Sequence, residues 1–441
     1  MSDFSPLEVF DRRESEVRGY IRSFPVVFDR ASGSTLVTAD GDEYLDFFAG
    51  AGVLNYGHNN PLFTKALVEY IEHGGILHGL DMATSAKRAF IEAFEQYVLE
   101  PRGYDYKIQF TGPTGANAVE AALKVARQAT GRTNVVAFTN GFHGLSLGAV
   151  AVTGNKKYRD AAGTTLGDVT RLPFEGYLGD KLDTLDLFEK MLDDTGSGLD
   201  LPAAVIVEAI QGEGGINVAS PEWLRRLRTI TEERGILLIL DEIQAGIGRS
   251  GSFFAFEESG IVPDLVTVSK SISASGLPMS LVLLRPAVDV WKPGAHTGTF
   301  RGNNLAFVTA RVALEQYWAD DVFMTTVAER SAELRAGLES IAADYPQLGL
   351  TVRGRGLMYG IVSLDDRDLP SRISAEAFQR GLVIETAGAF EEVLKFLPAL
   401  TLTSDELQTG LRIVRESLDA VLSGDDSEAE HAVEDHAASH A

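Results

Sequence analysis

Two short runs of this chain, both mainly apolar, end in side chains that can do chemistry. Residues 236–240 are aliphatic and lead into Asp241, and residues 265–268 lead through Ser269 into Lys270. Helix-like stretches separate such runs, and an alternation of strands and helices predicts an α/β fold with a mostly parallel sheet. Because the carboxyl ends of parallel strands face the ligand crevice, we expect Asp241 and Lys270 to meet one bound molecule there.

A carboxylate and an amine in this arrangement match the needs of pyridoxal 5'-phosphate. The aldehyde of this cofactor forms a Schiff base with a lysine, and a buried carboxylate keeps the ring nitrogen protonated, so that the ring accepts electrons. A lone loop lysine is usually only solvated. The pairing with Asp241 is what favours a chemical role for Lys270. An Asp-Glu pair after a strand also holds magnesium in nucleotide hydrolases, but no G-x-x-x-x-G-K-[ST] loop precedes it here.

A glycine-containing segment before a predicted helix could bind the phosphate of such a cofactor. Residues 111–117 lead directly into the helical pattern of residues 118–127. Free N–H groups and the helix dipole favour a dianion at this point, with Thr114 as a cap or a ligand, although the segment could equally be an ordinary loop–helix junction. Phe142 follows another predicted strand, residues 135–138, where its ring could cover a flat cofactor or belong to the core.

Together these segments resemble the class III, fold-type I pyridoxal-phosphate aminotransferases. The resemblance extends from about residue 22 to about residue 422, and its segments are residues 57–61, 114–120, 142–144, 208–215, 241–244 and 269–270. It implies a large domain with a mostly parallel seven-stranded sheet and a smaller α+β C-terminal domain. We expect an N-terminal arm at residues 1–45, the large cofactor-binding domain at 46–315 and the small domain at 316–422.

The resemblance also implies roles for individual residues. Lys270 is the Schiff-base lysine, Asp241 pairs with the ring nitrogen and Phe142 stacks on the ring. The further cofactor contacts that it implies are Thr114, Gly115, Ala116, His143, Glu208 and Gln244. Thr299 lies in a segment that resembles the one reaching the phosphate of the neighbouring subunit, which implies a homodimer, possibly paired into tetramers, with shared active sites.

Within this family, three segments resemble those of the diaminobutyrate–2-oxoglutarate aminotransferases of ectoine biosynthesis: residues 47–58, 276–280 and 291–294. The reaction implied is transfer of an amino group from L-glutamate to L-aspartate 4-semialdehyde, which gives L-2,4-diaminobutyrate and 2-oxoglutarate by a ping-pong mechanism. Aminotransferases acting on ornithine, acetylornithine or 4-aminobutyrate, and pyridoxal-phosphate aminomutases, share the fold and remain alternatives.

The residue that binds the substrate carboxylate is left open. Many class III members place an arginine after the aromatic-x-Gly turn, where this chain has Leu145. In ornithine- and aminobutyrate-type members the glutamate equivalent to Glu213 pairs with a C-terminal arginine, for which this chain has Lys395, and a lysine cannot make the bidentate fork. Lys395 is therefore either a point charge for a carboxylate or a surface residue. The other candidate cations are Arg301, Arg353 and Arg355.

Composition restricts the partners and the location. A net charge of −24 argues against nucleic acid and anionic membranes. The chain has no cysteine, and its eight histidines lack ligand spacing, so we expect no metal site. No apolar run approaches the ~20 residues of a membrane span and no signal peptide is visible, so we expect a cytoplasmic enzyme. Residues 423–441 are rich in Asp, Glu, Ala and His and are expected to form a disordered acidic tail.

Overall fold

The computed structural model describes residues 6–179 and 181–438, with side chains up to residue 424. Its large domain is built on a seven-stranded sheet in the order β4-β12-β11-β10-β7-β5-β6. The strands are β4 (Lys107–Phe110), β5 (Val135–Phe138), β6 (Val169–Leu172), β7 (Ala204–Val207), β10 (Leu237–Asp241), β11 (Leu265–Val268) and β12 (Leu281–Leu284). Strand β12 is antiparallel to both neighbours and the other pairs are parallel, which confirms the predicted mostly parallel sheet.

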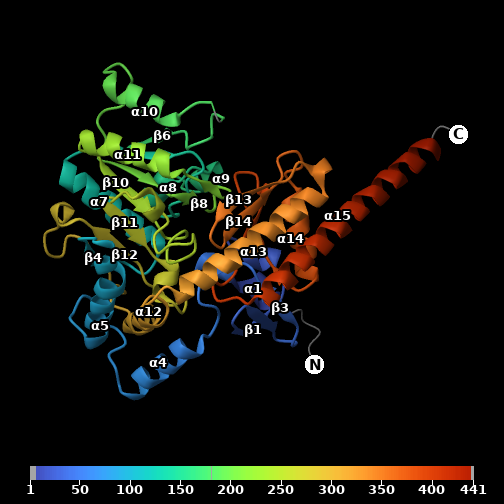
Figure 1. The fold of residues 1–441 in the computed structure, drawn as a ribbon, viewed down its shortest axis with the longest axis horizontal. Helices are drawn as coiled ribbons and strands as arrows, with labels where there is room; N and C mark the ends of the chain where they lie inside the picture. Colours follow the sequence, from blue (N-terminus) through green and yellow to red (C-terminus); the bar gives the residue numbers. More distant parts are fainter. Residues whose placement is uncertain (1–5, 180, 439–441) are drawn as a thin grey trace.

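Helices cover both faces of this sheet, as its apolar strands require. In β5, Val135 and Ala137 pack into the core that contains the apolar side of α7, whereas Val136 and Phe138 belong to the core on the opposite face. The covering helices include α5 (Ser85–Phe94), α7 (Gly115–Thr130), α10 (Thr184–Asp193), α11 (Pro221–Glu233) and α12 (Asn304–Tyr317). The large domain fills the left side of Figure 1. The carboxyl ends of β10 and β11 therefore lie inside a layered structure, where a site can be buried.

The small domain has its own sheet and its own core. Its antiparallel sheet has the order β13-β14-β17-β16. The elements are β13 (Thr351–Arg355), β14 (Met358–Val362), β16 (Glu385–Ala387), β17 (Val393–Phe396), α13 (Val322–Asp344), α14 (Leu369–Gln379) and α15 (Ser404–Ala438). It is drawn in orange and red to the right of the large domain in Figure 1. Since α12 packs in the large core and α13 in the small one, the change of core falls between Tyr317 and Val322.

The segment expected as an N-terminal arm is partly a sheet. Strands β1 (Phe28–Ser32), β2 (Thr35–Thr38) and β3 (Glu43–Asp46) join β15 (Leu382–Val383) of the small domain in the order β1-β2-β3-β15. An arm therefore describes only the residues before β1, which carry α1 (Glu8–Arg13) and α2 (Tyr20–Ser23). These strands are short and partly exposed, so their apolar pattern is too weak to be recognised in the sequence.

The expected tail also differs from the structure. Helix α15 continues to Ala438, so residues 423–438 are helical rather than disordered. The Ala and Glu residues that are frequent in this stretch have a high helix propensity. The side chains of residues 425–438, and residues 439–441 altogether, lie outside the described part of the chain, and so do the contacts of the tail histidines.

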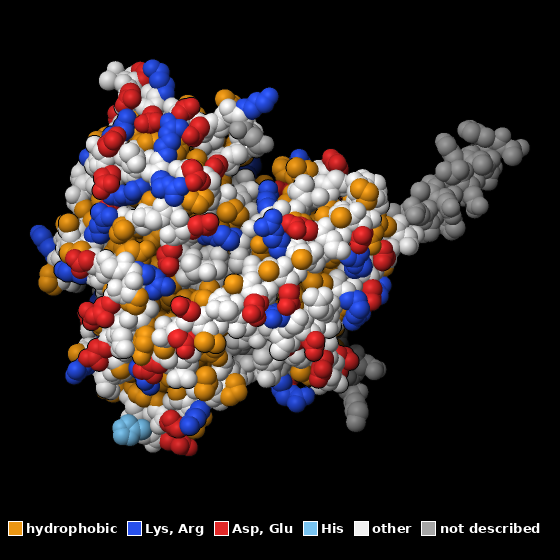
Figure 2. Space-filling view, viewed as in Figure 1, with side chains coloured by type: hydrophobic (Ala, Val, Ile, Leu, Met, Phe, Trp, Pro, Cys, Tyr) orange, Lys and Arg blue, Asp and Glu red, His pale blue; other side chains and the backbone are white. Residues whose placement is uncertain are grey.

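The other elements connect these layers. They are α3 (Ala49–Gly52), α4 (Pro61–Glu72), α6 (Glu100–Arg102), α8 (Leu147–Val152), α9 (Lys156–Asp160), β8 (Ile210–Gln211) and β9 (Asn217–Val218), with a π-helical turn η1 (Glu95–Leu99) and 3-10 turns η2 (Glu257–Ser259), η3 (Lys270–Ser273), η4 (Pro286–Val288) and η5 (Pro346–Leu348). Within the described residues no helix is long and apolar enough to cross a membrane. On the face shown in Figure 2, acidic and basic side chains are interspersed and form no broad basic patch.

Candidate active site

A buried cavity of about 170 Å³ lies at the carboxyl ends of β10 and β11. Its lining consists of Gly115, Ala116, Phe142, His143, Gly144, Glu208, Glu213, Asp241, Ile243, Gln244 and Lys270. Most residues predicted from the sequence are therefore brought together. The exceptions are Thr114, Thr299 and Lys395, which do not line this cavity. We call it the cofactor cavity.

Asp241 forms one wall of the cofactor cavity and is held firmly in place. Its Oδ2 lies 2.7 Å from Nδ1 of His143, and its Oδ1 accepts hydrogen bonds from Thr267 Oγ1 at 3.0 Å and from the Ile243 N–H at 3.2 Å. Burial disfavours a charged imidazole, but the bond to Asp241 and its charge outweigh burial and raise the pKa of His143. Because a carboxylate offers about four lone-pair positions, Asp241 keeps capacity for one more donor from the cavity.

Lys270 enters the cofactor cavity from the first residue of η3. Its backbone has φ +53°, a left-handed conformation that is uncommon for a residue with a side chain. Its Nζ donates a hydrogen bond to the carbonyl of Ala51 at 2.6 Å, and burial lowers the pKa of this amine. A lower pKa makes the uncharged amine, which is the nucleophilic form, easier to reach.

The start of α7 closes another side of the cofactor cavity. Thr114, the N-cap residue, is exposed, and Asn117 Oδ1 accepts hydrogen bonds from its N–H at 3.3 Å and from its hydroxyl at 3.0 Å. A Cβ atom on Gly115 would lie 3.0 Å from the Ile243 side chain, so a larger residue would crowd this point. Gly115 and Ala116 line the cavity, and the N–H groups at a helix start can bind an anion.

Two further side chains complete the cofactor cavity. Glu208 accepts a hydrogen bond from the Phe142 N–H at 2.8 Å and so fixes the backbone that carries this ring, and burial raises the pKa of Glu208 to about 7. Gln244 donates to the Ala51 carbonyl at 3.1 Å and to Glu213 at 2.9 Å, whereas its buried Oε1 accepts no hydrogen bond from any described residue. An acceptor without a donor beside a cavity fits a ligand that carries a hydroxyl group.

Lys395 is not a surface residue, contrary to one of the two interpretations above. It is fully buried in β17, opposite Glu385 of β16 in the strand register. Its Nζ lies 2.7 Å from Oε1 of Glu213 and 2.8 Å from Oε1 of Glu385. Burial disfavours the charge, but the two carboxylates outweigh it and raise the pKa of Lys395. The Tyr20 hydroxyl adds a long hydrogen bond of 3.4 Å to Oε2 of Glu385. We call these four residues the Lys395 cluster.

The other candidate cations are used elsewhere. Arg353 donates to the Gly215 carbonyl at 2.7 Å, Arg355 pairs with Glu258, and Arg301 donates to the His296 carbonyl at 3.1 Å. None of the three arginines lines the cofactor cavity or the larger cavity beside it. The sequence had left them as candidates because it shows no pairing partners.

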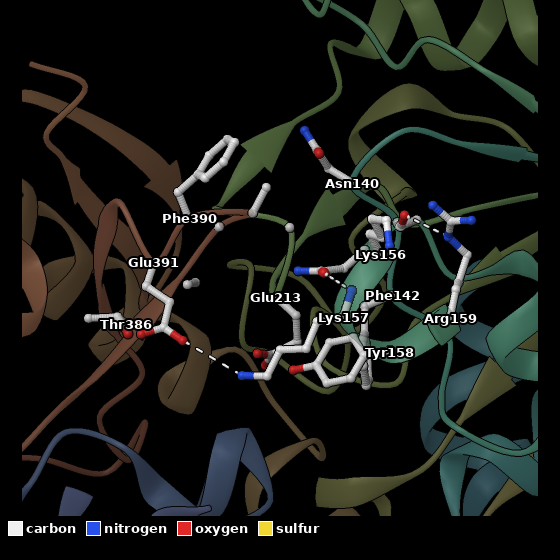
Figure 3. A pocket seen from close by; sticks show the side chains of 17 residues that line it. Asn140, Phe142, Lys156, Lys157, Tyr158, Arg159, Glu213, Thr386, Phe390 and Glu391 are labelled. Carbon is white, nitrogen blue, oxygen red and sulfur yellow. Dashed lines mark hydrogen bonds and ion pairs between the residues drawn. The ribbon is translucent and has the colours of Figure 1, made fainter. Parts of the chain in front are cut away.

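A second cavity of about 410 Å³ lies between the two domains and is shown in Figure 3. It shares Phe142 and Glu213 with the cofactor cavity. One wall is α9, and the opposite wall is formed by residues 386–391 of the small domain. Lys157 Nζ lies 3.9 Å from Glu391 Oε1 and connects the two walls. This outer cavity provides a route from solvent to the cofactor cavity.

Thr299 lies away from both cavities of its own chain. It is exposed, and its carbonyl accepts a hydrogen bond from Nε2 of His78 at 2.6 Å. The neighbouring Gly298 approaches Gly112, which precedes α7: a Cβ atom on Gly298 would lie 3.7 Å from the Gly112 Cα. Its contact with the phosphate of a neighbouring subunit stays a prediction.

Several residues of the site were missed in the sequence. Ile243 was quoted only as part of a motif, and Tyr20, Tyr158 and Glu385 were not considered. A signal did exist for Glu385, because an acidic residue directly after the apolar residues 382–384 is unusual in a buried strand. Tyr20 and Tyr158 carry no such signal, since an isolated tyrosine in a short helix fits many surface positions.

Fold and cavity together define a pyridoxal-phosphate enzyme of the aminotransferase type. The chain matches the family model of the class III aminotransferases over residues 18–418 and belongs to this family. It is 57% identical to the diaminobutyrate–2-oxoglutarate transaminase of Bordetella parapertussis over 95% of this chain and 96% of the relative. The enzyme of that name from Vibrio cholerae is 56% identical, over 93% of this chain and all of the relative.

A solved structure supports the fold. The ornithine aminotransferase of Toxoplasma gondii has a TM-score of 0.82 and 27% identity, and the match covers 96% of this chain and 97% of that one. The predicted family, enzyme class and cofactor are thereby confirmed. The residues of the cofactor cavity fit pyridoxal phosphate: an amine for its aldehyde, a carboxylate for its ring nitrogen, and a helix start for its phosphate.

Proposed function

We propose that this protein transfers an amino group between L-glutamate and L-aspartate 4-semialdehyde, giving L-2,4-diaminobutyrate and 2-oxoglutarate. The observation that carries the proposal is the buried pair of Lys270 and Asp241 in a chain that is more than half identical to named diaminobutyrate–2-oxoglutarate transaminases. Under this proposal the reaction supplies diaminobutyrate for ectoine, a solute of osmotically stressed cells, and takes place in the cytoplasm.

Lys270 has the chemical role in this mechanism. When bound, pyridoxal phosphate supplies an aldehyde that captures the amino group and a ring that stabilises negative charge on the neighbouring carbon. The Lys270 amine, whose pKa burial lowers, takes the proton from that carbon on Nζ and returns it on the cofactor side. Its bond to the Ala51 carbonyl fixes the direction from which Nζ approaches.

Asp241 and its neighbours hold the reacting system in one orientation. Asp241 keeps the ring nitrogen protonated, and the contact with His143 prevents the carboxylate from turning away. Phe142, fixed through its amide by Glu208, covers one face of the ring, and Ile243 lines the cavity beside Gly115. The side chains around Lys270 hold its Nζ beside the reacting atoms, so the proton that it takes from the substrate carbon is passed to the cofactor side.

The substrate reaches Lys270 through the outer cavity in this proposal. Leu145, at the position where many relatives have an arginine, is 55% exposed and cannot bind a carboxylate. Lys395 lines neither cavity and is paired with Glu213 and Glu385, so its role in this proposal is to hold Glu213, the residue that both cavities share. A homodimer, in which Thr299 of each subunit reaches the phosphate of the other, completes the proposed site.

The test is a direct assay of the reaction in the reverse direction. The purified, cofactor-loaded protein is incubated with L-2,4-diaminobutyrate with and without 2-oxoglutarate, and glutamate and the semialdehyde are measured. Glutamate that forms only with 2-oxoglutarate supports the proposal, and a panel with ornithine, acetylornithine and 4-aminobutyrate measures the preference. No glutamate from diaminobutyrate would reject it, and a product isomeric with the substrate would indicate an aminomutase. Light scattering of the same sample tests the dimer.

A further inference from the structure

The Lys395 cluster contains two carboxylates but only one cation. Glu213 and Glu385 both pair with Lys395, and Tyr20 adds a neutral hydroxyl group. Lys395 is fully buried and Glu385 is only 7% exposed, so water offsets little of the remaining charge. The Lys270 amine donates its hydrogen bond to the Ala51 carbonyl and forms no ion pair with either carboxylate among the described residues. The cluster therefore carries an excess negative charge when both carboxylates are ionised.

Burial and the negative charge of Glu213 act in the same direction on the pKa of Glu385. Burial raises the pKa of Glu385 to about 7, and the negative charge of Glu213 adds to this, although Lys395 opposes both. For Glu213, burial alone would raise the pKa, but Lys395 and Lys270 outweigh it and hold the pKa at about 2. Lys395 thus stabilises the ionised form of Glu213 but not that of Glu385 to the same degree. A second positive charge brought into the cavity would stabilise the two ionised carboxylates further.

Glu213 can present the excess charge to a ligand. Its Oε1 accepts from both Lys395 and Gln244, at 2.7 Å and 2.9 Å, whereas no described residue donates a hydrogen bond to its Oε2. Glu213 lines the cofactor cavity and the outer cavity, and Figure 3 shows it among the side chains that surround the outer one. An ammonium group that enters with the substrate can reach this oxygen without breaking either existing bond.

We propose that Glu385 makes the active site selective for substrates that carry a second ammonium group beyond the reacting carbon. Glu385 is a positioning residue in this proposal: it takes up part of the charge of Lys395, so that Glu213 keeps enough negative charge to bind that ammonium group through Oε2. Without Glu385, Lys395 would neutralise Glu213 alone. The inference rests on the proposed function and adds to it which feature of the amine is recognised.

The chemistry of the substrates provides a clean comparison. Diaminobutyrate that reacts through its terminal amine keeps an α-ammonium and an α-carboxylate at the far end of the molecule, and L-aspartate 4-semialdehyde has the same far end. 4-Aminobutyrate has the same carbon chain, the same terminal amine and the same carboxylate but no second ammonium group. The ratio of kcat/KM for diaminobutyrate to kcat/KM for 4-aminobutyrate therefore isolates recognition of the α-ammonium.

The experiment measures this ratio, with 2-oxoglutarate as acceptor, in the holoenzyme and in Glu385→Gln. We expect the ratio to fall by about tenfold or more, through a higher KM for diaminobutyrate with little change in kcat. Glu385→Asp keeps the charge and should keep most of the ratio. Glu416→Gln is the matched control, because Glu416 is a carboxylate of the same domain that lines neither cavity. It should change the ratio less than about twofold.

The possible outcomes separate the two proposals. A wild-type protein that forms no glutamate from diaminobutyrate overturns both of them. A wild-type preference that Glu385→Gln leaves unchanged, with normal absorbance of the bound cofactor, overturns the role of Glu385 and leaves the function intact. If Glu385→Gln does not fold, Glu213→Gln decides, because it removes the charge on the receiving side chain itself. An unchanged ratio in that variant likewise overturns the inference.

Discussion

Lys270 and Lys395 lie near the same cavity, and their surroundings shift their pKa values in opposite directions. Nζ of Lys270 donates to a single backbone carbonyl, that of Ala51, and burial lowers its pKa. Nζ of Lys395 lies within 2.8 Å of two carboxylates, which raise its pKa although this side chain is fully buried. Burial alone therefore does not determine what a lysine can do.

The difference comes from the partners that each position provides. The main chain supplies only a partial negative charge to Lys270, which leaves the amine free to lose its proton and act on a carbon atom. Lys395 is positioned by the register of two small-domain strands, which places it opposite Glu385. The large domain thus supplies the reactive amine, and the small domain supplies a fixed charge that can discriminate between substrates.

Replacing Lys270 should have the largest effect on activity. In Lys270→Ala we expect turnover to fall by about 10³-fold or more, because no other amine is placed to move the proton. Cofactor should still bind without a covalent bond, so borohydride reduction followed by mass spectrometry should attach it to the wild type only. Lys292→Ala, which changes an exposed lysine, is the control. Unchanged turnover in Lys270→Ala would transfer the chemical role to another residue.

Neutralising Asp241 tests whether the carboxylate supports the reactive lysine. Asp241→Asn keeps the shape but cannot hold a proton on the ring nitrogen, and we expect kcat to fall by about 10²- to 10³-fold. Thr267→Val, which removes only the 3.0 Å hydrogen bond to Oδ1, should cost much less. Both are measured as kcat with saturating diaminobutyrate and 2-oxoglutarate. Equal losses in the two variants would mean that Asp241 acts only by fixing the local structure.

The two lysines also differ in how well the sequence reveals them. Asp241 and Lys270 follow apolar runs that become neighbouring parallel strands, so one topological rule brings them together. The Lys395 cluster joins α2, the loop after β8, β16 and β17. Its assembly depends on strand register and on the approach of two domains, and neither follows from local patterns.

The fold, too, was predictable from the sequence only where local patterns determine it. The seven-stranded sheet was predictable because strands such as β5 and β7 are apolar at every position. The pairing of β3 with β15 was not, because it joins residues more than 300 positions apart through two short strands. Tyr20 becomes part of the site only because this sheet holds the N-terminal segment against the small domain.

Removing the charge of Lys395 should mainly affect stability. Lys395→Met leaves Glu213 and Glu385 buried without a cation, and we expect the free energy of unfolding to fall by about 3 kcal/mol near neutral pH. The pKa of Glu385 is about 7 in the folded protein and has an ordinary value of 4.5. The folded state thus binds the carboxyl proton of Glu385 more tightly than the unfolded state does. The contribution of Glu385 to the free energy of unfolding therefore falls as the pH rises from about 4.5 to about 7.

The variant should make this dependence steeper, because no cation remains to favour the ionised form. Denaturant unfolding of the holoenzyme at about pH 5 and about pH 8 should therefore show a larger difference from the wild type at the higher pH. Lys395→Arg keeps the charge and serves as the comparison. A loss that is the same at both pH values would mean that packing, not charge, makes Lys395 important.

A third lysine should give the smallest effect. Lys157 lines the outer cavity, but its side chain is 72% exposed, and its contact with Glu391 is 3.9 Å long. An exposed pair of this kind contributes about 0.5 kcal/mol or less, so Lys157→Ala should change KM for diaminobutyrate and for glutamate less than about twofold. A tenfold rise in KM for glutamate alone would instead identify Lys157 as an anchor for a substrate carboxylate. Recognition of the substrate by charge would then not be confined to the Lys395 cluster, because an exposed lysine of the large domain would also contribute to it.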